Sequence, residues 1–221
     1  MFKNSNFKEL LFRFIYYLVG LTILAFGLTL NTKTGFGASP IITIPFSISH
    51  ICGINIGNIT MIMYVLFIIV QLLLRDKKQR VLVLLQLPLA FVFTRFLNLF
   101  SILLPGPSSP MWLRILMLLG ALIFSGIGAA MSLNMQLVPN PADGIVQAIA
   151  DKTGKSVGFC KNIFDTSCVI LAVVICLVSG NPILGVGIGT LLSMIVVGRV
   201  ISVFNLLTEE KSRYLAGLDS E

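Results

Sequence analysis

Three ionisable residues in the second half of the chain have types and spacing that could do chemistry. Lys161 and Asp165 are four residues apart in an apolar segment, and Asp143 follows a Pro-rich break. Residues four apart share one face of a helix, so Lys161 and Asp165 can form an ion pair. A charge inside a membrane needs a partner or a water-filled path. The pair is therefore either structural or part of a site for a substrate or coupling ion.

Two arginines occupy corresponding places in apolar segments of the two halves. Arg95 begins Arg-Phe-Leu-Asn-Leu-Phe, and Arg199 begins Arg-Val-Ile-Ser-Val-Phe. Each lies near one end of its segment, so its side chain can extend to the membrane interface. A contact with a substrate is the alternative, and the sequence does not separate the two.

Two short segments could place helix ends near these charges. Ser39 precedes Pro40 and Asn140 precedes Pro141, which predicts an N-cap followed by proline at the first helical position. About ten residues with apolar spacing follow each proline, too few to span a bilayer. Each segment is either a surface helix or a helix whose N-terminus, a natural site for anions, faces a buried cavity. The candidate substrate-binding residues are Ser39, Pro40, Arg95, Asn140, Asp143, Lys161, Asp165 and Arg199.

The composition indicates that these residues lie in a membrane. Hydrophobic residues make up 56% of the 221 residues and charged residues 11%, and the mean hydropathy is +0.97. Soluble domains carry about 25% charged residues. Six apolar runs are each long enough to cross a bilayer. They are Leu10–Leu30, Ile56–Leu74, Val81–Leu104, Trp112–Leu133, Val157–Val178 and Ile183–Leu206.

The second half of the sequence is a shifted copy of the first. An offset of 101 residues places Gly27 on Gly128, Pro40 on Pro141, Gly53 on Gly154 and Gly57 on Gly158. Three spans per copy is an odd number, so the second copy must enter the membrane from the opposite side. The sequence thus predicts an all-α membrane protein of six transmembrane helices, built as two inverted three-helix repeats, each with a short extra helix after its first span. We expect one membrane domain over 1–221, with repeats at 9–104 and 112–207 and a cytoplasmic tail at 208–221.

The distribution of cations predicts the orientation. Lys and Arg cluster before the first span, after the second, after the fourth and after the sixth: Lys3, Lys8, Arg13, Arg75, Lys77, Lys78, Arg80, Lys152, Lys155, Lys211 and Arg213. The opposite side has only Lys33 and Arg114. The positive-inside rule then places both termini in the cytoplasm. We expect the protein in the plasma membrane. The net charge of +7 follows from this bias, so we expect no nucleic-acid partner.

Small residues at regular spacing predict close helix packing. GxxxG spacing lets two helix backbones approach, although glycine can also form a turn at a helix end. The candidate packing residues are Gly53, Gly57, Gly154, Gly158, Gly185 and Gly189. The cysteines show no metal-binding spacing, and Cys160, Cys168 and Cys176 recur on one expected helix face, which indicates burial. We expect no metal and no cofactor.

Several short phrases resemble those of the YczE/YitT-type family of bacterial integral membrane proteins. The matching phrases are Gly35-Phe-Gly37 with Pro40, Gly53-Ile-Asn-Ile-Gly57, Pro141-Ala-Asp143-Gly144, Thr153-Gly-Lys-Ser-Val-Gly158 and Gly187-Ile-Gly189-Thr190. Lys161 with Asp165 is similar to a basic and acidic pair in that family. One departure is Ile42, which stands where the first phrase of the family has an acidic residue. The resemblance implies a plasma-membrane protein, with transport as a permease one function that it suggests. It assigns no substrate.

Two functions compete on this evidence. A small secondary transporter or permease of unknown substrate explains the inverted repeat, the broken connections and the intramembrane charges. A non-transporting membrane scaffold or accessory protein explains the packing glycines equally well. An enzyme is not expected, because the sequence has no His cluster, HExxH or nucleotide-binding glycine loop. The expected partners are the lipid bilayer and a small molecule or ion, and the oligomeric state is open.

Cysteine labelling can test the predicted orientation. In a chain with Cys52→Ser, an impermeant maleimide should label Ser108→Cys in intact cells, because the loop between spans three and four is expected outside. Lys77→Cys should be labelled only after permeabilisation. Labelling of Lys77→Cys in intact cells would contradict the orientation.

Overall fold

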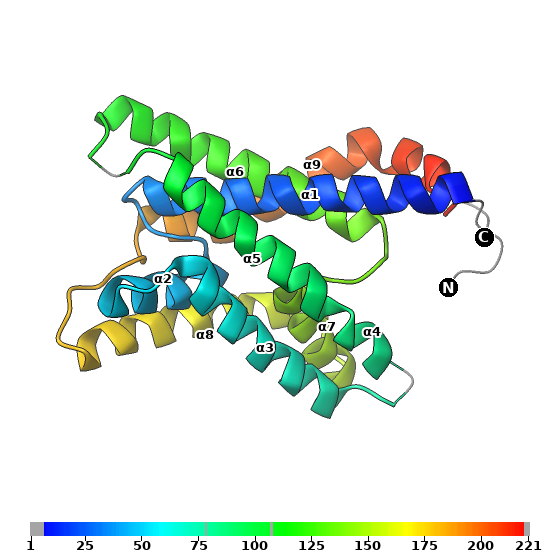
Figure 1. Ribbon diagram of the computed structural model, residues 1–221, viewed down its shortest axis with the longest axis horizontal. Coiled ribbons are helices and arrows are strands. Elements are labelled where there is room, and N and C mark those ends of the chain that lie inside the picture. Colours follow the sequence, from blue (N-terminus) through cyan, green and yellow to red (C-terminus); the bar gives the residue numbers. More distant parts are fainter. Residues whose placement is uncertain (1–6, 78, 107, 219–221) are drawn as a thin grey trace.

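A computed structural model describes residues 7–77, 79–106 and 108–218, and these residues form helices and connections without a strand. Figure 1 shows long helices crossing in one bundle, with shorter helices between them. The helices are α1 (Phe7–Lys33), α2 (Pro40–Cys52), α3 (Ile56–Leu74), α4 (Arg80–Leu84), α5 (Gln86–Leu103), α6 (Met111–Asn134), α7 (Pro141–Thr153), α8 (Val157–Val178) and α9 (Ile188–Leu215). Six segments are long and apolar enough to cross a membrane: α1, α3, α4 with α5, α6, α8 and α9. The predicted all-α class with six spans is confirmed.

The short helices α2 and α7 begin and end in the same way. Pro40 and Pro141 are their first residues, where a missing N–H removes no helical hydrogen bond. Gly53 and Gly154 follow them with φ of 69° and 68°, a left-handed conformation that a side chain disfavours. A Cβ at either glycine would meet no neighbouring atom within 4 Å. The packing role predicted for Gly53 and Gly154 is therefore wrong, and the alternative role in a turn is confirmed.

The predicted third span contains a break. Its apolar run divides into α4 and α5 at Leu85. Pro88 has no N–H to donate to the carbonyl of Leu84, so the helical hydrogen bonding is interrupted one turn before the proline.

Helices α1 and α6 lie side by side along one side of the bundle, at the top of Figure 1. A Cβ on Gly128 of α6 would overlap the backbone of Leu24, and one on Gly27 of α1 would overlap the backbone of Ser125. Small residues on both helices thus let the two backbones approach closely.

Further packing links each short helix to a long helix of the other half. Helix α2 packs on α8, and α7 packs on α3. Helix α5 packs on α1, and α9 packs on α6. Gly217, just after α9, contacts Glu9 at the start of α1, so the two ends of the described chain are adjacent. The superposition of the two halves as inverted repeats stays a prediction.

Some predicted boundaries and exposures differ from the structure. Arg13 was expected to precede the first span, but it lies inside α1 with 3% of its surface exposed and donates to the Met135 carbonyl oxygen at 2.9 Å. The last helix begins at Ile188 rather than Ile183 and continues to Leu215, through residues predicted as a tail. Lys3 and Lys78, counted for the orientation, lie outside the described residues. Cys160, Cys168 and Cys176 are buried and unbridged, as predicted.

Substitution of Gly128 should separate α1 and α6. Gly128→Ala places a methyl group against the Leu24 backbone, and we expect destabilisation of about 1–3 kcal/mol, typical of overpacking. Gly198→Ala in α9 is the matched control, because its Cβ would meet nothing within 4 Å. The melting temperature of the purified protein should fall for Gly128→Ala and stay equal or rise for Gly198→Ala. Equal melting temperatures of Gly128→Ala and the unaltered protein would contradict the close packing.

Candidate functional site

A cavity of about 380 Å³ lies among α1, α2, α6, α7, α8 and α9. The first turns of both short helices reach it, through Ser39 and Pro40 on one side and Asn140 and Asp143 on the other. Lys161 and Asp165 line it from α8. The structure therefore brings together six of the eight candidate substrate-binding residues, from segments far apart in the sequence. Leu, Val, Ile, Met and Ala side chains form most of the remaining wall.

The charges in this cavity form one cluster. The Lys161 Nζ lies 3.6 Å from Asp165 Oδ2 and 3.9 Å from Asp143 Oδ1. The ion pair predicted for Lys161 and Asp165 is confirmed. Asp165 is buried, whereas 39% of the Lys161 side chain is exposed. The contact with Asp143 adds a second carboxylate that sequence spacing could not indicate. Helix α7 supplies it because its first turn faces α8 across the cavity.

The two carboxylates differ in how well they are satisfied. Asp165 is 6% exposed, and its Oδ1 atom is buried without a hydrogen-bond partner. Its Oδ2 atom contacts Lys161, while a quarter of the Asp143 side chain is exposed. Buried polar atoms nearly always have partners, because an unmade hydrogen bond costs free energy. Asp165 Oδ1 is therefore the atom of this site that most needs a donor.

The two helix N-termini at the cavity are capped differently. Asn140 accepts a hydrogen bond from the Ala142 backbone N–H at 3.3 Å, as predicted for an N-cap. Ser39 occupies the equivalent position of α2 but makes no such bond, so its predicted role as a side-chain cap is wrong. Ser39 lies at the wall of the cavity.

Two tyrosines fix the segment before α7. The Tyr17 hydroxyl donates to the Val138 carbonyl oxygen at 2.7 Å. The Tyr64 hydroxyl shares a hydrogen bond with the Asn140 side chain. Both rings are almost fully buried. Helices α1 and α3 thus hold the start of α7 at a defined place beside the cavity.

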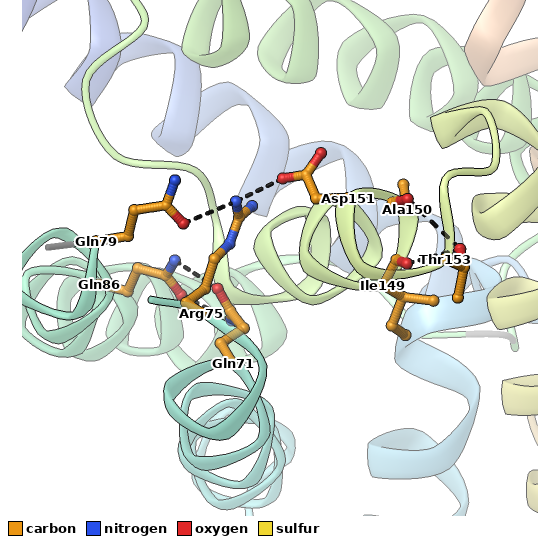
Figure 2. Close-up of polar contacts among 8 residues, drawn as sticks. All are labelled: Gln71, Arg75, Gln79, Gln86, Ile149, Ala150, Asp151 and Thr153. Atoms are coloured by element: carbon orange, nitrogen blue, oxygen red, sulfur yellow. Dashed lines mark hydrogen bonds and ion pairs between the residues drawn. The ribbon is translucent and has the colours of Figure 1, made fainter. Parts of the chain in front are cut away.

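Two buried glutamines hold the start of helix α7. Gln71 on α3 and Gln86 on α5 exchange two amide hydrogen bonds of 3.0 and 2.8 Å (Figure 2). Gln71 also donates to the Pro141 carbonyl oxygen at 3.1 Å. A Cβ on Gly144 would overlap this pair of amides. A larger residue at this position would therefore require the two amides to shift and disturb their hydrogen bonds.

An ion pair holds the far end of α7. Arg75, directly after α3, pairs with Asp151 and donates a further hydrogen bond to Gln79 at 3.2 Å (Figure 2). Asp151 is mostly exposed, so solvent weakens this ion pair. Together with the glutamine pair, it fixes both ends of α7 to the α3–α5 unit.

The segment before α2 is held by backbone contacts with the segment around the start of α9 and by Arg114, whose Nε donates to the Thr34 carbonyl oxygen at 2.6 Å. Ala38 donates its N–H to the Gly185 carbonyl oxygen at 2.7 Å, and Gly189 donates to the Phe36 carbonyl oxygen at 2.8 Å. The Asn31 side chain lies 2.8 Å from the hydroxyl of Ser193, and Ser193 lines the cavity. The glycine phrases before α2 and at the start of α9 therefore contact one another.

The remaining packing glycines have different surroundings. A Cβ at Gly57 would overlap the carbonyl oxygen of Thr94, and one at Gly189 would press on Phe36, so a packing role is confirmed for these two. Gly185 has φ of 75° and abuts the Phe46 ring, which combines a turn with packing. Gly158 meets nothing within 4 Å and lines the cavity, so its predicted packing is wrong in this structure.

Arg95 and Arg199 lie on exposed surfaces and do not line the cavity. The Arg95 guanidinium donates to Asn58 Oδ1 at 2.7 Å and lies over the Phe91 ring. It therefore bridges α3 and α5 on their outer side. A substrate contact of either arginine stays a prediction without support from the cavity.

Sequence reasoning missed the polar residues that support the site: Asn31, Tyr17, Tyr64, Gln71, Gln86 and Ser193. Each is a single polar or hydroxyl-bearing residue within an apolar run, and that is the signal that could have indicated them. Which partner each one bonds depends on helix packing, so the sequence alone could not supply it. Within 7–77, 79–106 and 108–218, no cluster of three His, Cys, Asp or Glu could hold a metal ion.

The fold and the cavity define an all-α, multi-pass type of membrane protein. A family model matches residues 11–206, and the chain belongs to this family, described as a family of unknown function (DUF6198). The chain is 28% identical over 195 residues to the uncharacterized membrane protein YczE of Bacillus subtilis (strain 168), covering 88% of this chain and 86% of that protein. It is 25% identical over 199 residues to the uncharacterized protein YyaS of the same organism, covering 89% and 94%. No solved structure matches, and the expected resemblance to the YczE type is confirmed.

Paired substitutions can separate a structural role of the charge cluster from a functional one. Lys161→Met leaves two carboxylates without their cation in the cavity, and it should lower the melting temperature more than Lys161→Met combined with Asp165→Leu. Removal of one partner of a buried pair typically costs about 3–5 kcal/mol. A purely structural pair predicts that the double variant keeps its function, whereas a substrate role predicts a folded but inactive double variant. Unaltered expression and function of both single variants would contradict either role.

Proposed function

We propose that this protein is a small secondary transporter, or permease, of the plasma membrane, with both termini in the cytoplasm. The observation that carries the proposal is a central cavity at which two interrupted helices begin beside a charge cluster. Carriers with internal repeats bind substrate where discontinuous helices meet near the bilayer midplane. A scaffold has no need for buried charges around a cavity, because unpaired charge lowers stability.

The inverted repeat supports the same proposal. The pairing of α2 with α8 corresponds to the pairing of α7 with α3, as an exchange of halves requires. Helices α2 and α7 both start at proline, and both end at a glycine with nearly the same φ and ψ. The cavity lies between them, where a pseudo-two-fold axis would place a substrate site.

The two halves differ in one respect: one of the two equivalent helix pairs, α3 with α5 and α8 with α9, is in close contact and the other is not. Helix α3 packs on α5, where the Gly57 N–H donates to Asn98 Oδ1 at 2.8 Å. The equivalent helices α8 and α9 make no comparable contact within the described residues. Gly158 and Gly198, which would correspond to Gly57 and Thr94, are both open and line the cavity. The cavity is therefore open between α8 and α9 and closed between α3 and α5.

This difference supports a carrier rather than a channel. An exchange of the two arrangements would close α8 on α9 and open α3 from α5, which exposes the cavity to the opposite side of the membrane. Under the predicted orientation the present opening faces the cytoplasm. The separate depression at the outer end of α3 and α5, which includes Asn98 and Ile56, shares no lining residue with the central cavity.

Reconstitution can test the proposal with two substitutions at one position. Proteoliposomes are incubated with a bacterial metabolite extract, and mass spectrometry measures which compounds accumulate relative to empty liposomes. Gly158→Phe should abolish this uptake, because the ring fills the mouth of the cavity in a place where no neighbour resists it. Gly158→Ala should keep uptake. Absence of any protein-dependent uptake across the extract would favour the scaffold, and equal uptake by Gly158→Phe would place the path elsewhere.

A further inference from the structure

We propose that the central cavity binds a ligand through a cationic nitrogen that carries N–H groups, such as a primary ammonium, held by Asp165 with Asp143 and attached to a small apolar body. The proposal rests on the proposed function in that it names the ligand class of the same cavity. It is carried by the unpartnered carboxylate oxygen of Asp165, the charge balance of the cluster and the apolar character of the wall.

The first argument is the hydrogen bonding of Asp165. Its Oδ1 atom is buried without a partner, and the residue is 94% buried at the wall of the cavity. A carboxylate oxygen only accepts hydrogen bonds, so the missing partner must be a donor. A donor that is itself cationic forms a shorter and stronger bond than a neutral one. Asp165 is a lining residue of the cavity, so a rotation of its carboxylate would bring this atom to an ammonium group there.

The second argument is the sum of the charges that face the cavity. Asp143 and Asp165 contribute −1 each and Lys161 contributes +1, which leaves −1. The described lining residues from α1, α2, α6 and α9 contain no Asp, Glu, Lys or Arg. One additional cation makes the side-chain charges neutral, whereas an anion at the two carboxylates would be repelled. The N-termini of α2 and α7 carry partial positive charge, so they suit a separate anionic group of the same ligand.

The third argument is geometric, because a ligand nitrogen can reach Asp165 from the open volume. Thr43 Oγ1 contacts the Cys168 carbonyl oxygen at 3.4 Å, which aligns α2 with α8 at that level. One turn earlier on each helix, Pro40 and Asp165 come to the same level beside the cavity. The first turn of α2, which has no side-chain cap, is there as well.

The fourth argument concerns the rest of the ligand. Leu24, Leu28, Met194, Val197 and Ile201 line the cavity away from the charges. A volume of about 380 Å³ accommodates a small organic molecule and greatly exceeds a bare ion. An inorganic cation would satisfy the charge balance but would leave the apolar wall without contacts. The ligand is therefore an organic amine, with or without a further anionic group.

Four matched probes can test this ligand class by their effect on the melting temperature of the purified protein. They are 3-methylbutylamine, 3-methylbutanol, 3-methylbutanoate and leucine, with sodium chloride against choline chloride as the inorganic arm. The amine should raise the melting temperature in a saturable manner, and the alcohol and the acid should not. Stabilisation by leucine as well would place an anionic group of the ligand near α2 and supports the same nitrogen site. Stabilisation by the acid alone, or by sodium alone, would overturn the proposal.

Two variants assign the effect to the cluster. Asp165→Asn keeps the shape of the side chain but removes its charge, so the affinity for the amine should fall about tenfold or more. Lys161→Met vacates the ammonium position between the two carboxylates, and 3-methylbutylamine should restore its melting temperature toward that of the unaltered protein, whereas 3-methylbutanol should not. This rescue provides a readout even if Asp165→Asn does not fold. Unchanged amine affinity in Asp165→Asn, or no rescue of Lys161→Met, would contradict the assignment.

These outcomes separate the ligand class from the function. Amine binding without uptake into proteoliposomes would leave the site intact and remove the transport proposal. The opposite result is protein-dependent uptake of compounds that lack a cationic nitrogen, with no effect of the amine on the melting temperature. It would support transport and remove the proposed ligand class.

Discussion

Two helices begin in the interior of this bundle, and their exposed first turns impose the main constraint on the rest of the structure. The first N–H groups of a helix have no partner within it, and an apolar surrounding cannot supply one. At α7 the Asn140 side chain accepts a hydrogen bond from the Ala142 N–H, and the Tyr64 hydroxyl in turn bonds the Asn140 side chain. At α2 no side-chain cap is present, and the first turn faces the cavity instead. A polar cavity beside these two ends is a consequence of where the helices start.

The supports of α7 and α2 differ in kind, and the difference has a structural result. Helix α7 is fixed to α3 and α5 by Gln71, Gln86 and the Arg75–Asp151 pair (Figure 2), so these elements form one tightly bonded unit. Helix α2 is linked to α8, but α8 is not closed on α9. The cavity thus has one bonded wall and one wall with room to move, an arrangement suited to a path that opens on one side at a time.

Most of the cavity wall is apolar, so the few charges in it determine what it can hold. Lys161 is shared between Asp143 and Asp165, at distances that leave both contacts long. A shared cation satisfies neither carboxylate fully, and one oxygen of Asp165 is left without a donor. In a low-dielectric surrounding such a group is costly. When a membrane protein retains such a charge, a functional role of the charge explains it better than a contribution to folding.

The sequence by itself determined the class, the six spans, the two short helices and the Lys161–Asp165 pair, because hydrophobic run length, proline position and helical spacing are local properties. It also indicated six of the residues at the cavity, since Pro-rich breaks and intramembrane charges stand out in an apolar chain. Only the tertiary structure decided that Asp143 joins the pair, that Arg95 and Arg199 lie outside, and that Gly57 packs whereas Gly158 is open. These outcomes depend on which helix faces which. Side-chain packing across the bundle determines which helices face each other. Two glycines in matching sequence phrases do not indicate these contacts.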